Sequence, residues 1–322
     1  MKVYIGQIKP TLGNVEKNLN IMLEVIDKAI AEKNDIVVFP ELSLTGYSLE
    51  DIVFDVAIKE VPSVLLEKSK EIGIIFGAVE LGEEEYPYNT AYYLEDGKVV
   101  HKHRKVYLPT YGAYQEGRNF MAGDKVRAFD TKFGRLGILI CEDVWHQSTQ
   151  YILAQDGAKY VFILFNSPAV VGKRKEELSE GWKTIVKTNS LLNGIYSVAV
   201  NRVGVEDGTA FFGNSFVVAP NGEIVAEGEY LKEDSFTCEL KEEEIRRARF
   251  KAPMFKTENL NLTKKEIERM RTTKTAKASI IRIAPPIVEE PSESLEPLKE
   301  LFEKEETAYR LSFTKSMETG IY

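Results

Sequence analysis

The chain has 322 residues, of which 43% are hydrophobic, and this length suffices for one large domain with an appendage. Its formal net charge is −8, and no basic patch of the kind that nucleic acids require stands out. No apolar run reaches the length that spans a bilayer. The composition favours a soluble globular protein without a nucleic-acid or membrane partner.

The chain contains two cysteines, Cys141 and Cys238, which are too few for a disulfide framework. Its N-terminus alternates as a strand does and lacks the long apolar region of a signal peptide. A reducing compartment follows from both observations, and we expect a cytoplasmic protein.

Short apolar runs alternate with helical patterns along the first 250 residues. In chain order, the patterns first predict a strand at 3–8 and a helix that Asn14 caps, with Leu19, Leu23, Ile26 and Ile30 at helical spacing. They then predict a strand at 36–39, a helix at 61–72, a strand at 74–79 and a hairpin of 90–94 with 99–103. Strands follow at 136–140 and 160–165, then a helix at 177–192, a strand at 196–201 and a hairpin of 216–218 with 224–226. Unbroken apolar strands are buried on both faces, so an α/β layered fold with helices outside a sheet core is expected.

The amino-acid composition of the sequence changes near Phe250. Basic residues cluster at 264–277, and a stretch rich in proline and glutamate follows at 284–294, which is typical of a linker or a surface arm. Apolar residues at 295–302 then recur at helical spacing. We therefore divide the chain into a domain at 1–250 and a C-terminal arm at 251–322. The arm is expected to pack on the body or a neighbouring subunit, with residues 280–322 crossing to that neighbour.

Chemically reactive or polar residues follow several apolar strands. Glu41, Cys141 and Asn166 each come directly after or close to a strand end, and Lys105 lies just past another. Ligands gather beyond the carboxyl ends of strands in open α/β folds, so these side chains are expected to share one site. Asn166 is expected either to contact a substrate or to hold the turn at its strand end.

Each of these residues, taken alone, has a plainer interpretation. A glutamate after a strand is usually solvated, a lysine in a basic cluster usually lies on the surface, and a lone cysteine is usually a small buried hydrophobe. We keep that last interpretation for Cys238. The set of a thiol, a carboxylate and an ammonium group is more informative, because cleavage of an amide needs all three.

An amide carbon is a poor electrophile, so its cleavage requires a strong nucleophile and a stabilised oxyanion. A thiolate supplies the nucleophile once a neighbouring group takes its proton. A carboxylate can take that proton, pass it to departing ammonia and then activate the water that cleaves the thioester. A lysine beside the main-chain N–H that follows the cysteine can hold the oxyanion, a contribution of roughly 3–4 kcal/mol per donor.

Three segments resemble the nitrilase, or carbon–nitrogen hydrolase, superfamily over most of residues 1–250. They are Phe39-Pro-Glu41-Leu-Ser-Leu-Thr-Gly-Tyr47, Arg104-Lys105-Val-Tyr-Leu-Pro-Thr-Tyr111 and Gly137-Ile-Leu-Ile-Cys141-Glu142-Asp143. The resemblance implies a four-layer α-β-β-α sandwich of the nitrilase type, here with a C-terminal extension, that pairs through a helical face into a homodimer or a larger homo-oligomer. It also implies Glu41 as base, Lys105 as oxyanion donor, Cys141 as nucleophile and Glu116 as support for the lysine and substrate.

Within that superfamily the motifs are similar to the glutaminase domain of glutamine-dependent NAD synthetase. The similarity implies that Tyr47, Tyr111 and Glu142 line a pocket for the substrate. Glu142 and Asp143 follow the cysteine where true nitrilases usually have Trp-Glu, which disfavours a nitrile substrate. The Ser-Gly-Gly-x-Asp-Ser loop of the synthetase domain is absent from this sequence, so we do not expect the chain alone to make NAD.

Three functions remain open on the sequence. The leading hypothesis is an amidase that releases ammonia from a small linear amide, the second is a glutaminase subunit that supplies a separate synthetase, and the third is a non-catalytic interaction protein. Thiol chemistry needs no metal or cofactor, and we expect none. The histidines at 101, 103 and 146 are interpreted as surface or loop residues, and Asp143 as the cap of a helix that begins near Val144.

Overall fold

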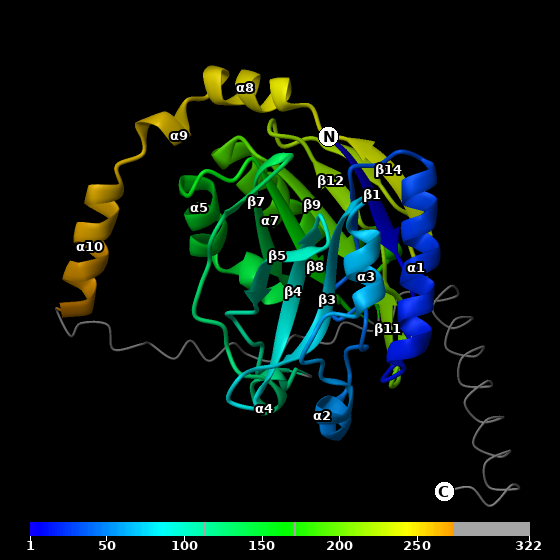
Figure 1. Cartoon of the computed structure of the whole chain (residues 1–322). Coiled ribbons are helices and arrows are strands. Elements are labelled where there is room, and N and C mark those ends of the chain that lie inside the picture. The colour runs from blue at the N-terminus through cyan, green and yellow to red at the C-terminus, as the bar shows by residue number, and fades with distance from the viewer. Residues whose placement is uncertain (113, 171, 273–322) are drawn as a thin grey trace, which may run out of the picture.

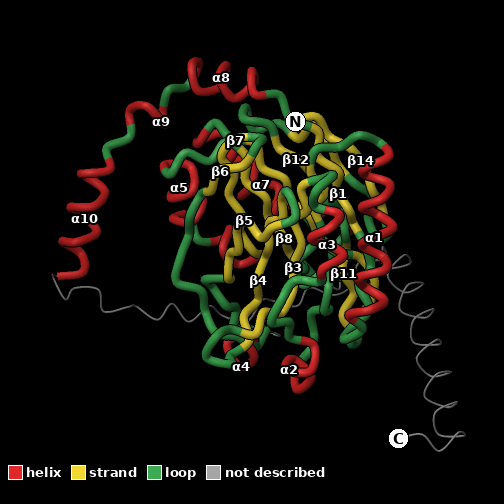
Figure 2. Tube along the Cα trace, in the orientation of Figure 1, coloured by secondary structure: helices red, strands yellow, loops and turns green. Residues whose placement is uncertain are grey.

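The computed structural model describes residues 1–112, 114–170 and 172–272, and two six-stranded sheets pack face to face at its centre (Figures 1 and 2). The first sheet has the order β14 (Asp234–Glu239), β1 (Lys2–Gln7), β2 (Ile36–Val38), β3 (Gly73–Leu81), β4 (Pro87–Glu95), β5 (Lys98–Arg104). The second has the order β13 (Ile224–Glu227), β12 (Phe216–Val218), β9 (Tyr196–Asn201), β8 (Tyr160–Phe165), β7 (Gly134–Ile140), β6 (Phe129–Thr131). A separate ribbon pairs β10 (Val203–Glu206) with β11 (Thr209–Phe212).

Helices cover the outer faces of both sheets (Figure 1). The first sheet carries α1 (Val15–Ala31) and α3 (Ser63–Lys68), and the second carries α5 (Gln147–Gln155) and α7 (Glu180–Asn193). The expected four-layer α-β-β-α sandwich of the nitrilase type is therefore confirmed. Short turns η1 (Glu50–Ile52), α2 (Val53–Val56), α4 (Glu116–Asn119), η2 (Cys141–Trp145) and α6 (Lys175–Leu178) join these elements.

The domain ends with α8 (Glu242–Lys251), whose Arg249 donates to the carbonyls of Gly194 and Ala158 at 3.1 Å each, and the described part of the arm follows as α9 (Met254–Thr257) and α10 (Leu260–Thr272) (Figure 1). Across residues 1–272, apart from 113 and 171, none of the helices combines the length and the apolar character needed to cross a bilayer. The predicted helix at 295–302 and the predicted crossing of 280–322 to a neighbouring subunit lie outside the described residues.

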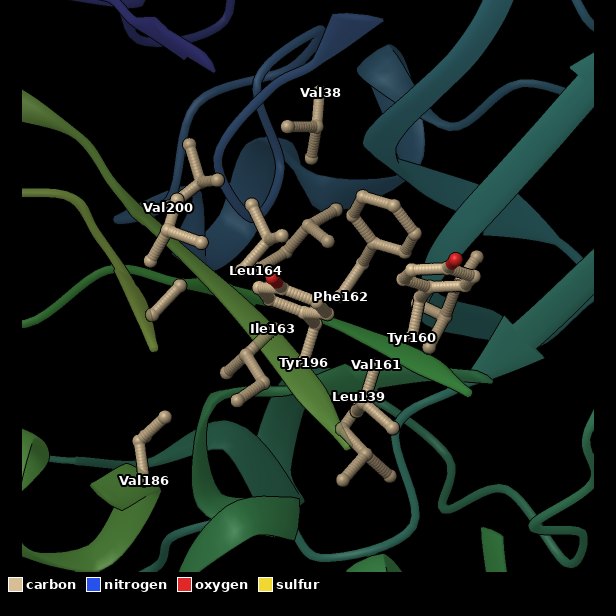
Figure 3. Close-up of a cluster of buried hydrophobic side chains, with 14 of the residues drawn as sticks. Val38, Leu139, Tyr160, Val161, Phe162, Ile163, Leu164, Val186, Tyr196 and Val200 are labelled. Carbon is tan, nitrogen blue, oxygen red and sulfur yellow. The ribbon is translucent and has the colours of Figure 1, made fainter. Parts of the chain in front are cut away.

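Apolar side chains from both faces of the second sheet form the largest core (Figure 3). Successive residues of a strand point to opposite faces, so Phe162 and Leu164 of β8 lie on the side of Val38 in the first sheet, whereas Ile163 lies on the side of Val186 in α7. All five side chains are fully buried or nearly so. This double burial explains why the strand is an unbroken apolar run.

Local signals predicted most boundaries, and the exceptions have physical causes. Asn14 caps α1 as expected, since its side chain accepts a hydrogen bond from the N–H of Lys17 at 3.0 Å. The helix predicted at 61–72 spans only Ser63–Lys68. Its later start follows from Pro62, which disfavours helical backbone in the residue before it. The helix predicted at 177–192 is interrupted at Ser179. Residues 260–272, expected within a linker or arm, form a helix.

The turn after β2 packs closely on Gly77 of β3. The N–H of Leu44 donates to the Gly77 carbonyl at 3.0 Å, and the N–H of Gly77 donates to Ser43 Oγ at 3.2 Å. A Cβ atom added at Gly77 would lie 2.3 Å from the main-chain nitrogen of Leu42 and 3.0 Å from the carbonyl carbon of Glu41. Glycine in this strand therefore allows a close backbone approach, and that approach places Glu41.

Gly77→Ala should lower the free energy of unfolding by about 2 kcal/mol, because the methyl group displaces the buried 41–44 turn. Urea denaturation measures this change. Gly181→Ala is the matched control, because the nearest atom to an added Cβ is a Trp145 ring carbon at 3.4 Å. That substitution lies in α7 and should be neutral or stabilising by up to about 1 kcal/mol. Equal stability of Gly77→Ala and the unmodified chain would contradict the close-approach argument.

Candidate active site

Strand directions bring four of the predicted site residues to the same end of the two sheets. β2 is parallel to β3, and two antiparallel pairings then lead through β4 to β5, so β2 and β5 run in the same direction. Glu41 follows β2 and Lys105 follows β5, while Cys141 and Asn166 directly follow the parallel strands β7 and β8. Asn166 Nδ2 donates to the main-chain carbonyl of Glu41 at 2.9 Å, which joins the two sheets at this end.

Lys105 lies between two carboxylates in the protein interior. Its Nζ donates to Glu41 Oε1 at 2.8 Å and to Glu116 Oε1 at 2.7 Å, and its side chain has no exposed surface. Asn89 Nδ2 donates to the same Glu41 oxygen at 2.7 Å. Among the described residues, Glu41 Oε2 has no hydrogen-bond partner, so this buried oxygen is free to accept a proton.

Cys141 begins the turn η2 with a φ of +46°, in the left-handed region that costs a residue with a side chain about 1 kcal/mol or more. Burial raises the pKa of its thiol well above the ordinary value, and Glu41 raises it further, whereas Lys105 and a hydrogen bond from the Asn166 main chain lower it. The residue Cys141 is 8% exposed, against 1% for Glu41. A protonated thiol beside a carboxylate requires proton transfer before it can act as a nucleophile.

Burial and the charges of the cluster also shift the pKa values of Lys105 and Glu116. Burial alone would lower the pKa of Lys105, but Glu116 and Glu41 outweigh it and hold this pKa well above the ordinary value. Burial raises the pKa of Glu116 to about 6, against the lowering effect of Lys105. The two carboxylates therefore favour the charged form of the lysine, and burial favours the protonated form of Glu116.

Tyr47 connects this cluster to a second buried ion pair. Its hydroxyl donates to Glu116 Oε1 at 2.6 Å, and its main-chain N–H donates to Glu206 Oε1 at 2.8 Å. Glu206 is paired with Arg202, whose Nη2 donates to the Pro10 carbonyl at 3.0 Å. Tyr47 therefore fixes, by a hydrogen bond, the position of the Glu116 carboxylate that accepts from Lys105.

Tyr111 and Glu142 form a hydrogen-bonded pair at the surface of the cluster. The Tyr111 hydroxyl is 2.9 Å from each carboxylate oxygen of Glu142, and Tyr111 is 59% exposed. The ring of Tyr114 meets that of Tyr111 edge-on, with centroids 6.0 Å apart. The residues predicted from sequence thus divide into an inner group, which holds the charges and the thiol, and an outer pair that can meet a substrate.

The three histidines occupy separate places. His103 is buried and its Nε2 lies 2.8 Å from Asp143 Oδ2, so its interpretation as a surface or loop residue is wrong. His101 stacks on Phe129, and His146 stacks on Tyr107. Within residues 1–112, 114–170 and 172–272, no group of three or more histidine, cysteine or acidic residues is arranged to hold a metal ion.

The interpretation of Asp143 as a helix cap is also wrong. Asp143 lies inside η2, and α5 begins four residues later at Gln147. Its carboxylate instead accepts hydrogen bonds from the N–H groups of Val106 and Tyr107, at 3.0 Å each. A cap assignment uses only local sequence, and these two partners lie in the segment that follows β5.

Comparison with known proteins agrees with this geometry. The carbon-nitrogen hydrolase family matches residues 2–250. The chain belongs to the carbon–nitrogen hydrolase family. It is 32% identical over 248 residues to the glutamine-dependent NAD(+) synthetase of Acinetobacter baylyi. The matched region covers 76% of this chain but only 45% of that relative. It is 28% identical over 249 residues to the nitrilase of Pyrococcus abyssi, covering 74% of this chain and 89% of the relative.

The fold of this carbon–nitrogen hydrolase also matches a solved structure. The crystal structure of a carbon-nitrogen hydrolase from Helicobacter pylori superimposes with a TM-score of 0.76 at 24% identity, covering 84% of this chain and 98% of the other. At that identity the likeness concerns the fold alone.

Sequence reasoning missed several residues of this hydrolase's site, namely Asn89, Tyr114, His103, Arg202 and Glu206. Asn89 interrupts the strongly buried strand β4, and a polar side chain within such a strand is a detectable signal. Glu206 contacts the site through its hydrogen bond with Tyr47, which is 159 residues away along the chain. A pattern of neighbouring residues cannot reveal such a contact.

The rate of the hydrolase should fall as the pH decreases through about 6, because protonation of Glu116 removes one of the two anions that hold Lys105. Glu116→Gln keeps an oxygen for Lys105 and Tyr47 but cannot titrate. We expect this variant to lose the acid limb near pH 6 and to keep a rate about tenfold lower, because a neutral acceptor binds an ammonium group less strongly. A pH profile of kcat/KM measures both effects, and an unchanged acid limb would exclude Glu116 as its source.

Proposed function

We propose that this chain hydrolyses the C–N bond of a small linear amide through a thioester on Cys141 and releases ammonia. The observation that carries the proposal is the position of Lys105, held at 2.8 and 2.7 Å between Glu41 and Glu116 in the same buried cluster as the Cys141 thiol. A thiol, a proton acceptor and a cation in one cluster supply all the groups that amide cleavage needs.

In the first half of the reaction, the Cys141 sulfur attacks the amide carbon and its proton moves to Glu41. The carbonyl oxygen becomes an oxyanion, which the Lys105 ammonium and the main-chain N–H of Glu142 stabilise. Glu41 then returns the proton to the amide nitrogen. The C–N bond breaks, ammonia leaves and an acyl thioester remains on Cys141.

In the second half, water attacks the thioester carbon while Glu41 accepts one of its protons. The same two donors hold the second oxyanion. The C–S bond breaks, the sulfur regains the proton from Glu41, and the carboxylic acid leaves. The sum is one amide and one water consumed, with one acid and one ammonia formed.

Cys141→Ala should lower ammonia release from a panel of small amides by at least about 10³-fold, because no other group in the cluster can form the acyl intermediate. Cys238→Ala is the matched control. This second cysteine lies in β14, and burial raises its pKa to about 11, so its loss should leave turnover unchanged.

Ammonia release by Cys141→Ala at the unmodified rate would remove the proposal. Iodoacetamide provides an independent measurement of the thiol. Alkylation of Cys141 no faster than that of Cys238 would favour a non-catalytic interaction protein instead.

A second candidate is a glutaminase subunit that supplies ammonia to a separate synthetase chain. The Glu142 carboxylate supports it, since Tyr111 fixes this anion at the surface of the cluster, where it can bind the ammonium group of an amino acid amide. The similarity to glutamine-dependent NAD(+) synthetases points the same way.

The pairing of subunits through a helical face stays a prediction. The helices α5 and α7 expose the apolar side chains of Ile152, Leu191 and Leu192, which such a pairing could bury.

Glu142→Gln should raise KM for glutamine about tenfold and change kcat little, because the main-chain N–H at this position remains as an oxyanion donor. Glutaramate, which is glutamine without its amino group, is the matched substrate, and its KM should not rise. Ammonia release measured with both substrates tests this. If the unmodified chain does not prefer glutamine to glutaramate, the glutamine candidate fails and the general amidase proposal stands.

A further inference from the structure

The carboxylate of Asp143 has no exposed surface and is surrounded by four hydrogen-bonding partners. Its Oδ1 accepts from the N–H groups of Val106 and Tyr107 at 3.0 Å each. Its Oδ2 accepts from the N–H of Ile140 at 3.1 Å and lies 2.8 Å from His103 Nε2. An ionised carboxylate has four acceptor positions, so this one is fully used and leaves no room for a substrate or an ion.

These partners flank two of the proposed catalytic residues. Val106 directly follows Lys105, and Ile140 directly precedes Cys141. His103 lies two residues before Lys105 on β5. One side chain therefore joins the end of β5 in the first sheet to the end of β7 in the second. A cap would bond only to its own turn, as Asp143 does with Ile140, yet the other three bonds join Asp143 to β5 and the segment that follows it.

We infer that Asp143 and His103 form a positioning unit that fixes the Lys105 ammonium group relative to the Cys141 sulfur. The inference rests on the proposed function. It adds that the two catalytic residues, which stand on different sheets, keep their geometry through this carboxylate. Catalytic groups need placement within about 0.5 Å, and a main-chain segment held at both ends of a buried hydrogen-bond network meets that requirement.

His103 is the member of the unit that can be tested without altering the carboxylate. Its Nε2 must carry the proton, because Asp143 can only accept. A glutamine side chain places an amide N–H near the position of a histidine Nε2, whereas an asparagine side chain is too short to reach Asp143. His103→Gln and His103→Asn therefore differ in reach but not in chemistry.

The experiment measures two quantities for each variant, kcat and KM for amide hydrolysis and the rate of Cys141 alkylation by iodoacetamide between pH 6 and 9. The charged groups that act on this thiol are Glu41, Lys105 and Glu116, and a displaced Lys105 would lower the thiol's pKa less. The titratable side chains of Tyr47, Tyr111 and Tyr114 also interact with it. His101→Asn is the matched control on the same strand, because the ring of His101 stacks on Phe129 and not on the Asp143 carboxylate.

For His103→Asn we expect kcat to fall about 30-fold with KM within twofold, and Cys141 alkylation at pH 7.5 to slow at least fivefold. His103→Gln should recover most of both rates, and His101→Asn should match the unmodified chain. Normal kinetics and normal alkylation in His103→Asn would overturn the inference. So would a loss in His103→Gln as large as that in His103→Asn, since reach would then not matter.

Asp143→Asn gives a second route if His103→Asn does not fold. Its amide can satisfy the N–H groups of Val106 and Tyr107 or that of Ile140, but not both, so the same slowing of alkylation is expected, and its absence would contradict the inference. Alkylation of Cys141 displaces iodide and requires no hydrolysis of an amide. A chain that hydrolyses no amide but shows the predicted alkylation pattern would therefore refute the proposed function and keep the positioning unit.

Discussion

The Lys105 ammonium group lies 2.8 Å from an oxygen of Glu41 and 2.7 Å from an oxygen of Glu116, without exposed surface. Transfer of a charge from water to the protein interior costs several kcal/mol, and only well-placed opposite charges offset that cost. The fold meets this constraint with residues from three segments. Gly77 permits the close turn that places Glu41, and Tyr47 holds Glu116. The same arrangement leaves a cation beside the Cys141 thiol, where amide cleavage needs one.

The buried charges form two linked groups. Arg202 and Glu206 make a second ion pair, and Glu206 accepts hydrogen bonds from the main-chain N–H groups of Tyr47 and Ser48. Through Tyr47 this pair is connected to Glu116 and so to Lys105. A change in either ion pair therefore alters the surroundings of the other, and their contributions to stability are not additive.

The sequence predicted the elements whose signals are local. β8 and β9 were predicted to the residue, because each is a mostly apolar run that ends at an asparagine. Glu41, Lys105 and Cys141 could be selected because each follows a strand. Asp143 could not be understood in this way, since an aspartate near a helix start looks like a cap and three of its four partners lie 36 to 40 residues away. Contacts between the two sheets have no local signature.

β1 lies between β2 and β14, so the first strand of the chain pairs with one of the last in this domain. During synthesis on the ribosome, β2 is available early, but β14 begins only at Asp234. One edge of β1 is therefore unpaired until nearly all of the domain has been made. Unpaired edges associate with other chains, and contacts between distant residues form slowly. Premature termination before β14 would leave this edge open permanently, which makes truncated products of this domain prone to aggregate.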